Sequence, residues 1–204
     1  MADLPPNHHA DYPQFSGLFG HVAGLTMIIG RGRDAQLVAD LCDLQPNDRA
    51  LDIGCGPGTA VRHVAERCAS VTGVDPAEPM LRLARVLTRL RRPSGEIDWV
   101  QAGAEDLTLP DESFTACWSL ASVHHWPDLT GGIDEVKRVL APNGTFVAIE
   151  KRTEPEATGN ASHGWTSDQA AAFAGMLTEH GFSSTEVTDH ELGRRSVVAV
   201  TASK

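Results

Sequence analysis

A glycine-rich turn after a short apolar run constrains this chain more than any other stretch. Residues 51–60 read LDIGCGPGTA, which places Gly54, Gly56 and Gly58 at alternate positions before a segment that is compatible with a helix. Because glycine has no Cβ, such a turn lets a ligand approach bare backbone. Dinucleotide-binding folds use a similar turn with the spacing G-x-G-x-x-G, in which the last glycine closes the packing beside a pyrophosphate. The shorter G-x-G-x-G spacing predicts a strand-turn-helix ligand loop that does not cradle a pyrophosphate.

Strand-like and helix-like patterns alternate on both sides of this turn. Short apolar runs predict strands, and they lie at 50–53, 71–74, 97–101, 114–119 and 145–150. Helical patterns lie between them, at 34–44, 60–68, 78–91 and 133–140, with Asp34 as the expected N-cap of the first. This alternation predicts a parallel sheet with helices on both faces.

The C-terminal part has a different pattern. A helix is expected over 167–180, ended by Gly181, and two β-like runs follow at 184–191 and 196–202. Gly193 lies between the two runs and favours a turn there. We therefore expect an antiparallel hairpin at the end of the sheet.

Composition limits the class of protein. A chain of 204 residues predicts one domain, and a net charge of −10 argues against nucleic acid or an anionic membrane as the main partner. None of the four cysteines forms a C-x-x-C pair, so no metal site is expected. The sequence shows neither a signal-peptide pattern at its start nor an apolar run long enough to span a bilayer, which predicts a cytoplasmic protein. Residues 1–33 lack a clear period and are expected to form an arm or lid, or else a partly ordered tail, beside a main domain at 34–204.

Asp75 comes twenty-one residues after Gly54, at the end of the second expected strand. An acidic residue at that separation is placed to accept hydrogen bonds from ribose hydroxyls. The alternative is that Asp75 caps the helix that begins near Pro76.

The glycine turn and the order of elements resemble the class I S-adenosylmethionine (SAM) methyltransferases over about 34–202. The resemblance implies an α/β fold of three layers, Rossmann-like, with a mostly parallel seven-stranded sheet that ends in a C-terminal antiparallel hairpin. It also implies SAM as the methyl donor and a cofactor site at Asp52, Gly54, Cys55, Gly56, Asp75, Pro76, Met80, Ala104, Glu105 and Ser119.

Two positions differ from what is usual in the family, and a third residue has an alternative role. Gly103 stands where the family usually has an aspartate that binds the adenine amino group, although Ala104 and Glu105 keep the rest of that turn. Thr115 also stands where an aspartate is frequent. Met80 is expected either to pack on the adenine or to belong to the core.

The segment after the fourth expected strand carries the candidate catalytic residues. His124, His125 and Trp126 resemble the type-11-like branch that methylates small molecules. A histidine there is expected to take a proton from an attacking hydroxyl or carboxyl group, since histidine titrates near neutrality. The alternative is that these residues only shape the loop while in-line positioning carries the catalysis. Trp126, with Tyr12 and Phe15 of the N-terminal arm, is expected to cover the acceptor.

Three functions remain open from the sequence. The first is a methyltransferase that uses SAM and a small-molecule acceptor, as a monomer or homodimer. The second is a SAM-binding protein that is regulatory or non-catalytic. The third is an NAD(P)-dependent oxidoreductase, which the glycine spacing disfavours.

Overall fold

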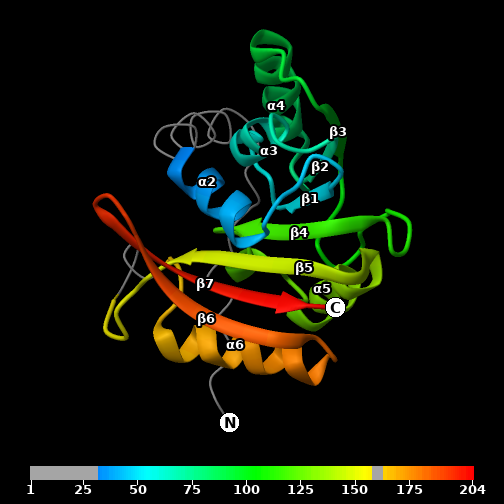
Figure 1. The fold of residues 1–204 in the computed structure, drawn as a ribbon. Coiled ribbons are helices and arrows are strands. Elements are labelled where there is room, and N and C mark those ends of the chain that lie inside the picture. The colour runs from blue at the N-terminus through cyan, green and yellow to red at the C-terminus, as the bar shows by residue number, and fades with distance from the viewer. Residues whose placement is uncertain (1–31, 158–162) are drawn as a thin grey trace.

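The computed structural model describes residues 32–157 and 163–204, in which strands and helices alternate along most of the chain (Figure 1). The helices of the first half are α2 (Gly32–Leu41), α3 (Thr59–Val64) and α4 (Glu78–Arg91), and the strands between and after them are β1 (Arg49–Ile53), β2 (Ser70–Val74), β3 (Glu96–Val100) and β4 (Phe114–Leu120). The second half contains the 3-10 helix η1 (Val123–His125), α5 (Leu129–Val139), β5 (Leu140–Lys151), α6 (Ser167–Glu179), β6 (Ser183–Leu192) and β7 (Arg195–Ser203).

The strands form one seven-stranded sheet in the order β3-β2-β1-β4-β5-β7-β6. The pairs from β3 to β5 are parallel, whereas β7 runs antiparallel to both β5 and β6. Gly193, at φ +74°, makes the turn between β6 and β7. The predicted parallel sheet and its C-terminal antiparallel hairpin are therefore confirmed.

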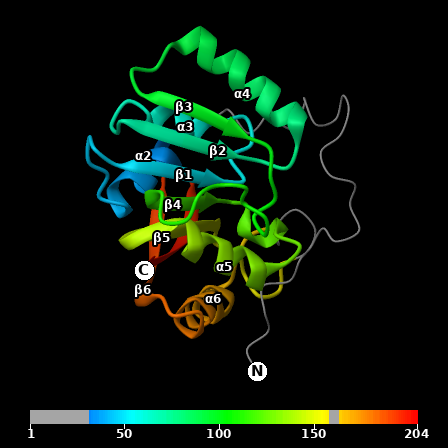
Figure 2. The same ribbon diagram turned by 90° about the vertical axis from the view of Figure 1, so that its right-hand side faces the viewer.

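Helices cover both faces of the sheet (Figure 2). On one face, α2, α3 and α4 contribute Val38, Val61 and Leu81 to a core cluster that includes Trp118 of β4. On the other face, α5 and α6 contribute Ile133 and Phe173 to a second cluster. This arrangement confirms the expected three layers. None of the described helices has the length and apolarity needed to cross a membrane.

Some helices and strands start at other residues than predicted, and local contacts explain the difference. Asp128 accepts a hydrogen bond from Gly131 N at 2.9 Å, so α5 begins at Leu129 rather than Ile133. Asp34 is not the N-cap of α2: it lies in the first turn, and both of its carboxylate oxygens accept from Arg195 Nη2 at 2.8 Å. α5 ends at Val139, next to the predicted end of the helix at 140, whereas β5 starts at Leu140, earlier than the predicted strand at 145–150. The pairing of β5 with β4 is irregular between Leu140 and Thr145.

Candidate functional site

The sequence-predicted residues gather at one edge of the sheet. Gly54, Asp75 and the segment after Leu120 follow the carboxyl ends of β1, β2 and β4, and the arrowheads of β2 and β3 point to this edge in Figure 2. In open sheets of this kind, ligands bind outside the carboxyl ends of the strands. The predicted arm, with Tyr12 and Phe15, lies outside the described residues.

The three glycines of the turn have different surroundings. All three have positive φ angles, of 78°, 53° and 73° for Gly54, Gly56 and Gly58. A Cβ on Gly54 would overlap the Ser122 side chain, and a Cβ on Gly58 would overlap the Trp99 ring. A Cβ on Gly56 would meet nothing within 4 Å among the described residues. Packing within the protein therefore requires glycine at 54 and 58, whereas the backbone of Gly56 is open to a ligand.

Arg62 holds the glycine turn through a buried side-chain contact that was not predicted from the sequence. Its side chain is buried on α3, and Nη1 donates to the Pro57 carbonyl at 2.5 Å. Burial lowers the pKa of Arg62 to about 10. The only feature of the sequence that hints at this contact is an arginine four residues after the last glycine. Such a position does not tell whether the side chain is buried or solvated.

Cys55 fills space within the turn. Its side chain is buried, and burial raises the pKa of the thiol well above its ordinary value, with the charges of Asp52 and Asp75 adding to the effect. A thiol in these surroundings ionises less readily than a free cysteine, which makes Cys55 a poor nucleophile.

Asp75 joins the glycine turn to the segment before α4. Its Oδ2 accepts from Gly56 N at 2.8 Å, and its Oδ1 accepts from Ala77 N at 2.9 Å. Burial raises the pKa of Asp75, and these two backbone hydrogen bonds oppose that rise. Each carboxylate oxygen has a second lone pair, so the local turn and the predicted ribose contact are compatible. The N-cap of α4 is Ala77 rather than Asp75.

Several buried oxygens near this edge have no hydrogen-bond partner among the described residues, and Glu105 Oε2 and Ser119 Oγ belong to residues of the predicted cofactor site. Such groups are costly without a donor, which makes them candidates for ligand contacts. The Glu105 carboxylate lies over Gly103, where a Cβ would come within 2.6 Å of Oε1. A side chain at 103, including the aspartate that the resemblance implies, would displace Glu105.

The other predicted cofactor residues surround these groups. Asp52 and Met80 are buried at 1% and 3% exposure, so the core position of Met80 is confirmed and its predicted adenine contact stays a prediction. Ala104 is also buried, whereas Pro76 is exposed and its carbonyl accepts from Gln101.

The chain leaves β4 through a strained residue and places two histidines at the same edge. Ala121 has a φ of 52°, and its N–H donates to Ile149 O at 2.7 Å. The chain then turns into η1, where His124 Nδ1 lies 2.8 Å from Glu150 Oε2. The two side chains are 5% and 0% exposed, so this is a buried histidine–carboxylate pair. Glu150 was not predicted from the sequence, although an acidic residue near the end of an apolar strand, at the edge where the glycine turn lies, is a usable signal.

Trp126 lies farther inside than predicted. It is 5% exposed and belongs to the core cluster beneath α5, where it packs against Gly132. This placement accounts for Trp126 as a packing residue, and its predicted contact with an acceptor stays a prediction.

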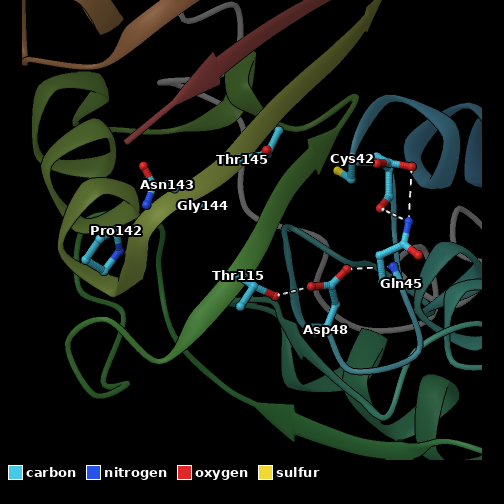
Figure 3. A pocket seen from close by; sticks show the side chains of 9 residues that line it. Cys42, Gln45, Asp48, Thr115, Pro142, Asn143, Gly144 and Thr145 are labelled. Carbon is cyan, nitrogen blue, oxygen red and sulfur yellow. Dashed lines mark hydrogen bonds between the residues drawn. The ribbon is translucent and has the colours of Figure 1, made fainter.

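A surface depression lies at the opposite edge of the sheet (Figure 3). It is lined by residues at the amino ends of β1 and β4, where Thr115 Oγ1 donates to Asp48 Oδ1 at 2.7 Å. Thr115 therefore anchors the loop before β1, far from the glycine turn in the topology of the sheet. We assign no ligand to this depression.

The comparisons with known proteins agree with this geometry. Residues 51–148 match a family described as methyltransferase domain. The chain is 35% identical over 123 residues to 27-O-demethylrifamycin SV methyltransferase of Amycolatopsis mediterranei, covering 60% of this chain and 45% of that protein. It is 33% identical over 108 residues to cycloartenol-C-24-methyltransferase 1 of Oryza sativa subsp. japonica, covering 52% and 31%.

A solved structure shows the same fold. A SAM-dependent methyltransferase from Aquifex aeolicus superposes with a TM-score of 0.75 at 16% identity, covering 89% of this chain and 97% of that one. The matched segment spans less than half the length of the two curated relatives.

Proposed function

We propose that the methyltransferase domain matched by residues 51–148 is a class I SAM-dependent one, and that the protein transfers the methyl group of SAM to a small-molecule nucleophile. The observation that carries the proposal is the turn at 54–58, in which Gly56 is open to a ligand and hydrogen-bonded to Asp75. SAM supplies an electrophilic methyl carbon on a positively charged sulfur, so the protein's main task is to bind and align the reactants.

The site fits SAM by the chemistry of its groups. Asp75 has free lone pairs for the ribose hydroxyls, and Gly56 exposes backbone beside it. Glu105 Oε2 and Ser119 Oγ are buried acceptors without donors among the described residues, and SAM carries amino groups on its adenine and on its amino-acid end. We assign Glu105 to the adenine amino group, since it lies over Gly103 and occupies the space of the missing aspartate.

The remaining predicted residues complete the proposed cofactor site. Asp52 and Gly54 border the amino-acid end, and Cys55 fills the turn. The other members are Pro76, Met80 and Ala104. His124 and His125, whose ring centroids are 4.0 Å apart, are the proposed groups for proton transfer at the acceptor. Trp126, the next residue, belongs to the core cluster.

The acceptor is proposed to be a small molecule. The two curated relatives described above are named for a rifamycin and for cycloartenol. The net charge of −10 also disfavours a nucleic-acid acceptor. We further propose that the protein is cytoplasmic, because Cys42, Cys55, Cys68 and Cys117 are free thiols, and that it is a monomer or homodimer.

Isothermal titration with SAM and with S-adenosylhomocysteine tests the cofactor assignment. We expect binding of both with dissociation constants below about 1 mM. No heat with either ligand would reject the proposal, and binding of NAD(P) instead would favour an oxidoreductase. A protein that binds SAM but forms no S-adenosylhomocysteine with any acceptor would be a non-catalytic SAM-binding protein.

A further inference from the structure

Helix α4 exposes large apolar side chains on the side that faces away from the sheet. Val86 is 52% exposed and Leu90 is 75% exposed, and they are two of the three large apolar residues that are exposed in the described part of the chain. Figures 1 and 2 show α4 at the periphery of the molecule, beside the edge strand β3. Single exposed apolar residues are common, so the arrangement of these two decides whether they form a contact surface.

The exposed apolar residues of α4 follow the spacing by which two helices pair. An apolar stripe consists of Pro79, Leu83, Val86 and Leu90, whose members lie four, three and four residues apart. Because a helix turns by about 100° per residue, these four positions fall within a sector of about 60°. A 4-3-4 spacing is that of the a and d positions of a heptad, whose side chains insert between those of a facing helix. The stripe therefore has the pattern of a helix-docking seam.

Arginines line one side of the apolar stripe. On the same helical projection, Arg82, Arg85 and Arg89 occupy the sector next to Val86. The guanidinium groups of Arg82 and Arg85 lie 3.2 and 3.1 Å from the same oxygen of Glu78, so one carboxylate serves both. Arg89 forms no ion pair with another described residue. The outer side of α4 thus combines apolar contact area with cations that the protein itself neutralises only in part.

The charge of this helix is opposite to that of the chain. Residues 78–92 contain five arginines and one glutamate, a net charge of +4 in a chain whose net charge is −10. A second copy with α4 packed on α4 would set arginines opposite arginines, and like charges beside a heptad seam disfavour pairing. An anionic bilayer would be repelled by the acidic remainder of the chain. The charge pattern therefore favours a partner that is itself locally acidic.

The exposed part of the stripe lies away from the glycine turn. α4 starts after Ala77, whose N–H donates to Asp75 at the edge of the sheet where the glycine turn lies. The helix ends before β3 begins at Glu96, at the opposite edge. Val86 and Leu90 belong to the C-terminal half of α4, so a partner bound there leaves the glycine turn accessible.

We propose that the outer side of α4 is a docking surface for an acidic amphipathic helix of a partner protein. Apolar side chains of that helix, at a and d spacing, pack on the apolar stripe. Its Asp or Glu side chains, beside the seam, pair with Arg82, Arg85 and Arg89, since a guanidinium group can donate two parallel hydrogen bonds to a carboxylate. The stripe is only about 16 Å long, so the complex is transient rather than obligate.

Two synthetic peptides test this surface on the full chain. Each has three heptads with leucine at a and d, and one has glutamate where the other has lysine at e and g, so that like charges oppose self-pairing of either peptide. Fluorescence anisotropy of the labelled peptides should show binding of the glutamate peptide that is at least about tenfold tighter than that of the lysine peptide. The affinity should decrease when NaCl is raised from about 50 mM to about 500 mM.

Substitutions on α4 separate the apolar contact from the ionic one. Leu90→Ser should weaken binding of the glutamate peptide by about tenfold, because it removes the most exposed side chain of the stripe. The double variant Arg82→Glu/Arg89→Glu should bind the glutamate peptide about tenfold more weakly and the lysine peptide about tenfold more tightly. Such a reversal of preference cannot result from loss of structure.

Two substitutions on the distant hairpin are the matched controls. Val187→Ser removes the third exposed large apolar residue of the described chain, on β6, and Arg194→Glu reverses an exposed arginine between β6 and β7. Both should bind the peptides as wild type does. Titration of every variant with SAM should give the wild-type affinity, because none of these residues is assigned to the cofactor. Failure of the protein to bind SAM would reject the proposed function and leave the peptide test unaffected.

The contrary outcomes identify another role for the stripe. No binding of the glutamate peptide up to about 1 mM, or equal affinity for the two peptides, overturns the docking surface. Self-association of the protein in sedimentation velocity, abolished by Leu90→Ser, would assign the stripe to a second copy of the chain instead. Cosedimentation with vesicles of phosphatidylcholine and phosphatidylglycerol, lost in Arg82→Glu/Arg89→Glu without any peptide preference in the wild type, would assign it to a membrane.

Discussion

Gly56 donates its backbone N–H to Asp75 Oδ2 at 2.8 Å, so the glycine of the turn that has open space beside it is held by the residue predicted to bind the ribose. The same carboxylate accepts from Ala77 N before α4. One buried side chain therefore fixes the positions of the loops after β1 and β2, and its remaining lone pairs are available to a ligand.

Replacing Asp75 with asparagine should weaken SAM binding. The amide has one acceptor oxygen, so its nitrogen faces either Gly56 N or Ala77 N, both of which are donors. We expect a loss of affinity of about tenfold or more, measured by titration calorimetry. Asp98→Asn on β3 is the control, since Asp98 is exposed, and it should bind SAM as wild type does. Unchanged affinity in Asp75→Asn would contradict the ribose assignment.

The glycines of the turn should respond differently to alanine. Gly58→Ala forces a Cβ into the Trp99 ring at a positive φ and should lower the free energy of unfolding by about 2 kcal/mol or more. Gly56→Ala meets no neighbour and should cost only about 1 kcal/mol, but its Cβ lies where SAM is expected to approach.

Urea denaturation and calorimetry separate these two effects. Gly56→Ala should lose SAM affinity by far more than its small change in stability explains. Gly175→Ala, in the exposed interior of α6, is the control and should raise stability by about 0.5–1 kcal/mol. Normal SAM binding by Gly56→Ala would show that the turn does not touch the cofactor.

Glu105→Ala should reduce SAM affinity by about tenfold if its carboxylate accepts from the adenine amino group. The neighbouring Asp106→Ala removes an exposed carboxylate of similar charge and should leave the affinity unchanged. Calorimetry on both variants distinguishes a specific contact from a general electrostatic effect. Equal affinity losses would reject the adenine contact.

The order of the sheet could be predicted because its signals are local. Each apolar run and each turn residue, such as Gly181 and Gly193, indicates its own element, and the expected and observed elements overlap along the described chain. The starts of α5 and β5 were less predictable. The early start of β5 depends on the pairing of Leu140 with Phe114, which are twenty-six residues apart, and the register of the two strands shifts between this pair and Ala116–Thr145.

The candidate site also contains residues that local sequence signals could predict and residues that depend on tertiary contacts. The glycine turn and Asp75 lie in a short, recognisable spacing, whereas the partner of His124 is twenty-six residues away and depends on where β5 ends. Arg62 was also missed, because its buried contact with Pro57 depends on how α3 packs. Sequence patterns thus indicated the edge of the sheet where we propose that a ligand binds, and the structure adds the tertiary contacts of individual side chains there.

Arg62→Met should loosen the glycine turn. It removes the donor to the Pro57 carbonyl, which should lower the free energy of unfolding by about 1–2 kcal/mol, partly offset because methionine has no charge to bury. SAM affinity should decrease severalfold. Arg67→Met, which loses a half-exposed pair with Asp40, should change stability by less than about 1 kcal/mol and leave SAM binding unchanged. Identical SAM affinity in both variants would contradict a supporting role for Arg62.

Stability in acid should depend on Glu135, whose carboxylate holds Arg138 and the backbone N–H of Leu107. The hydrogen bond with Arg138 lowers the pKa of Glu135 below its ordinary value. A carboxyl whose pKa is lower in the folded state stabilises the fold above its unfolded pKa, and this contribution is lost as the pH falls through the folded pKa. Glu135→Gln should therefore cost about 1 kcal/mol at pH 7, where the pair is partly buried.

Below about pH 4 the difference between Glu135→Gln and wild type should shrink, because the wild-type carboxylate becomes protonated there. Urea unfolding measured across this pH range checks the expected convergence. Glu66→Gln, at an exposed position, should follow the wild-type curve throughout. A difference that stays constant down to the lowest pH would mean that Glu135 acts through packing rather than through its charge.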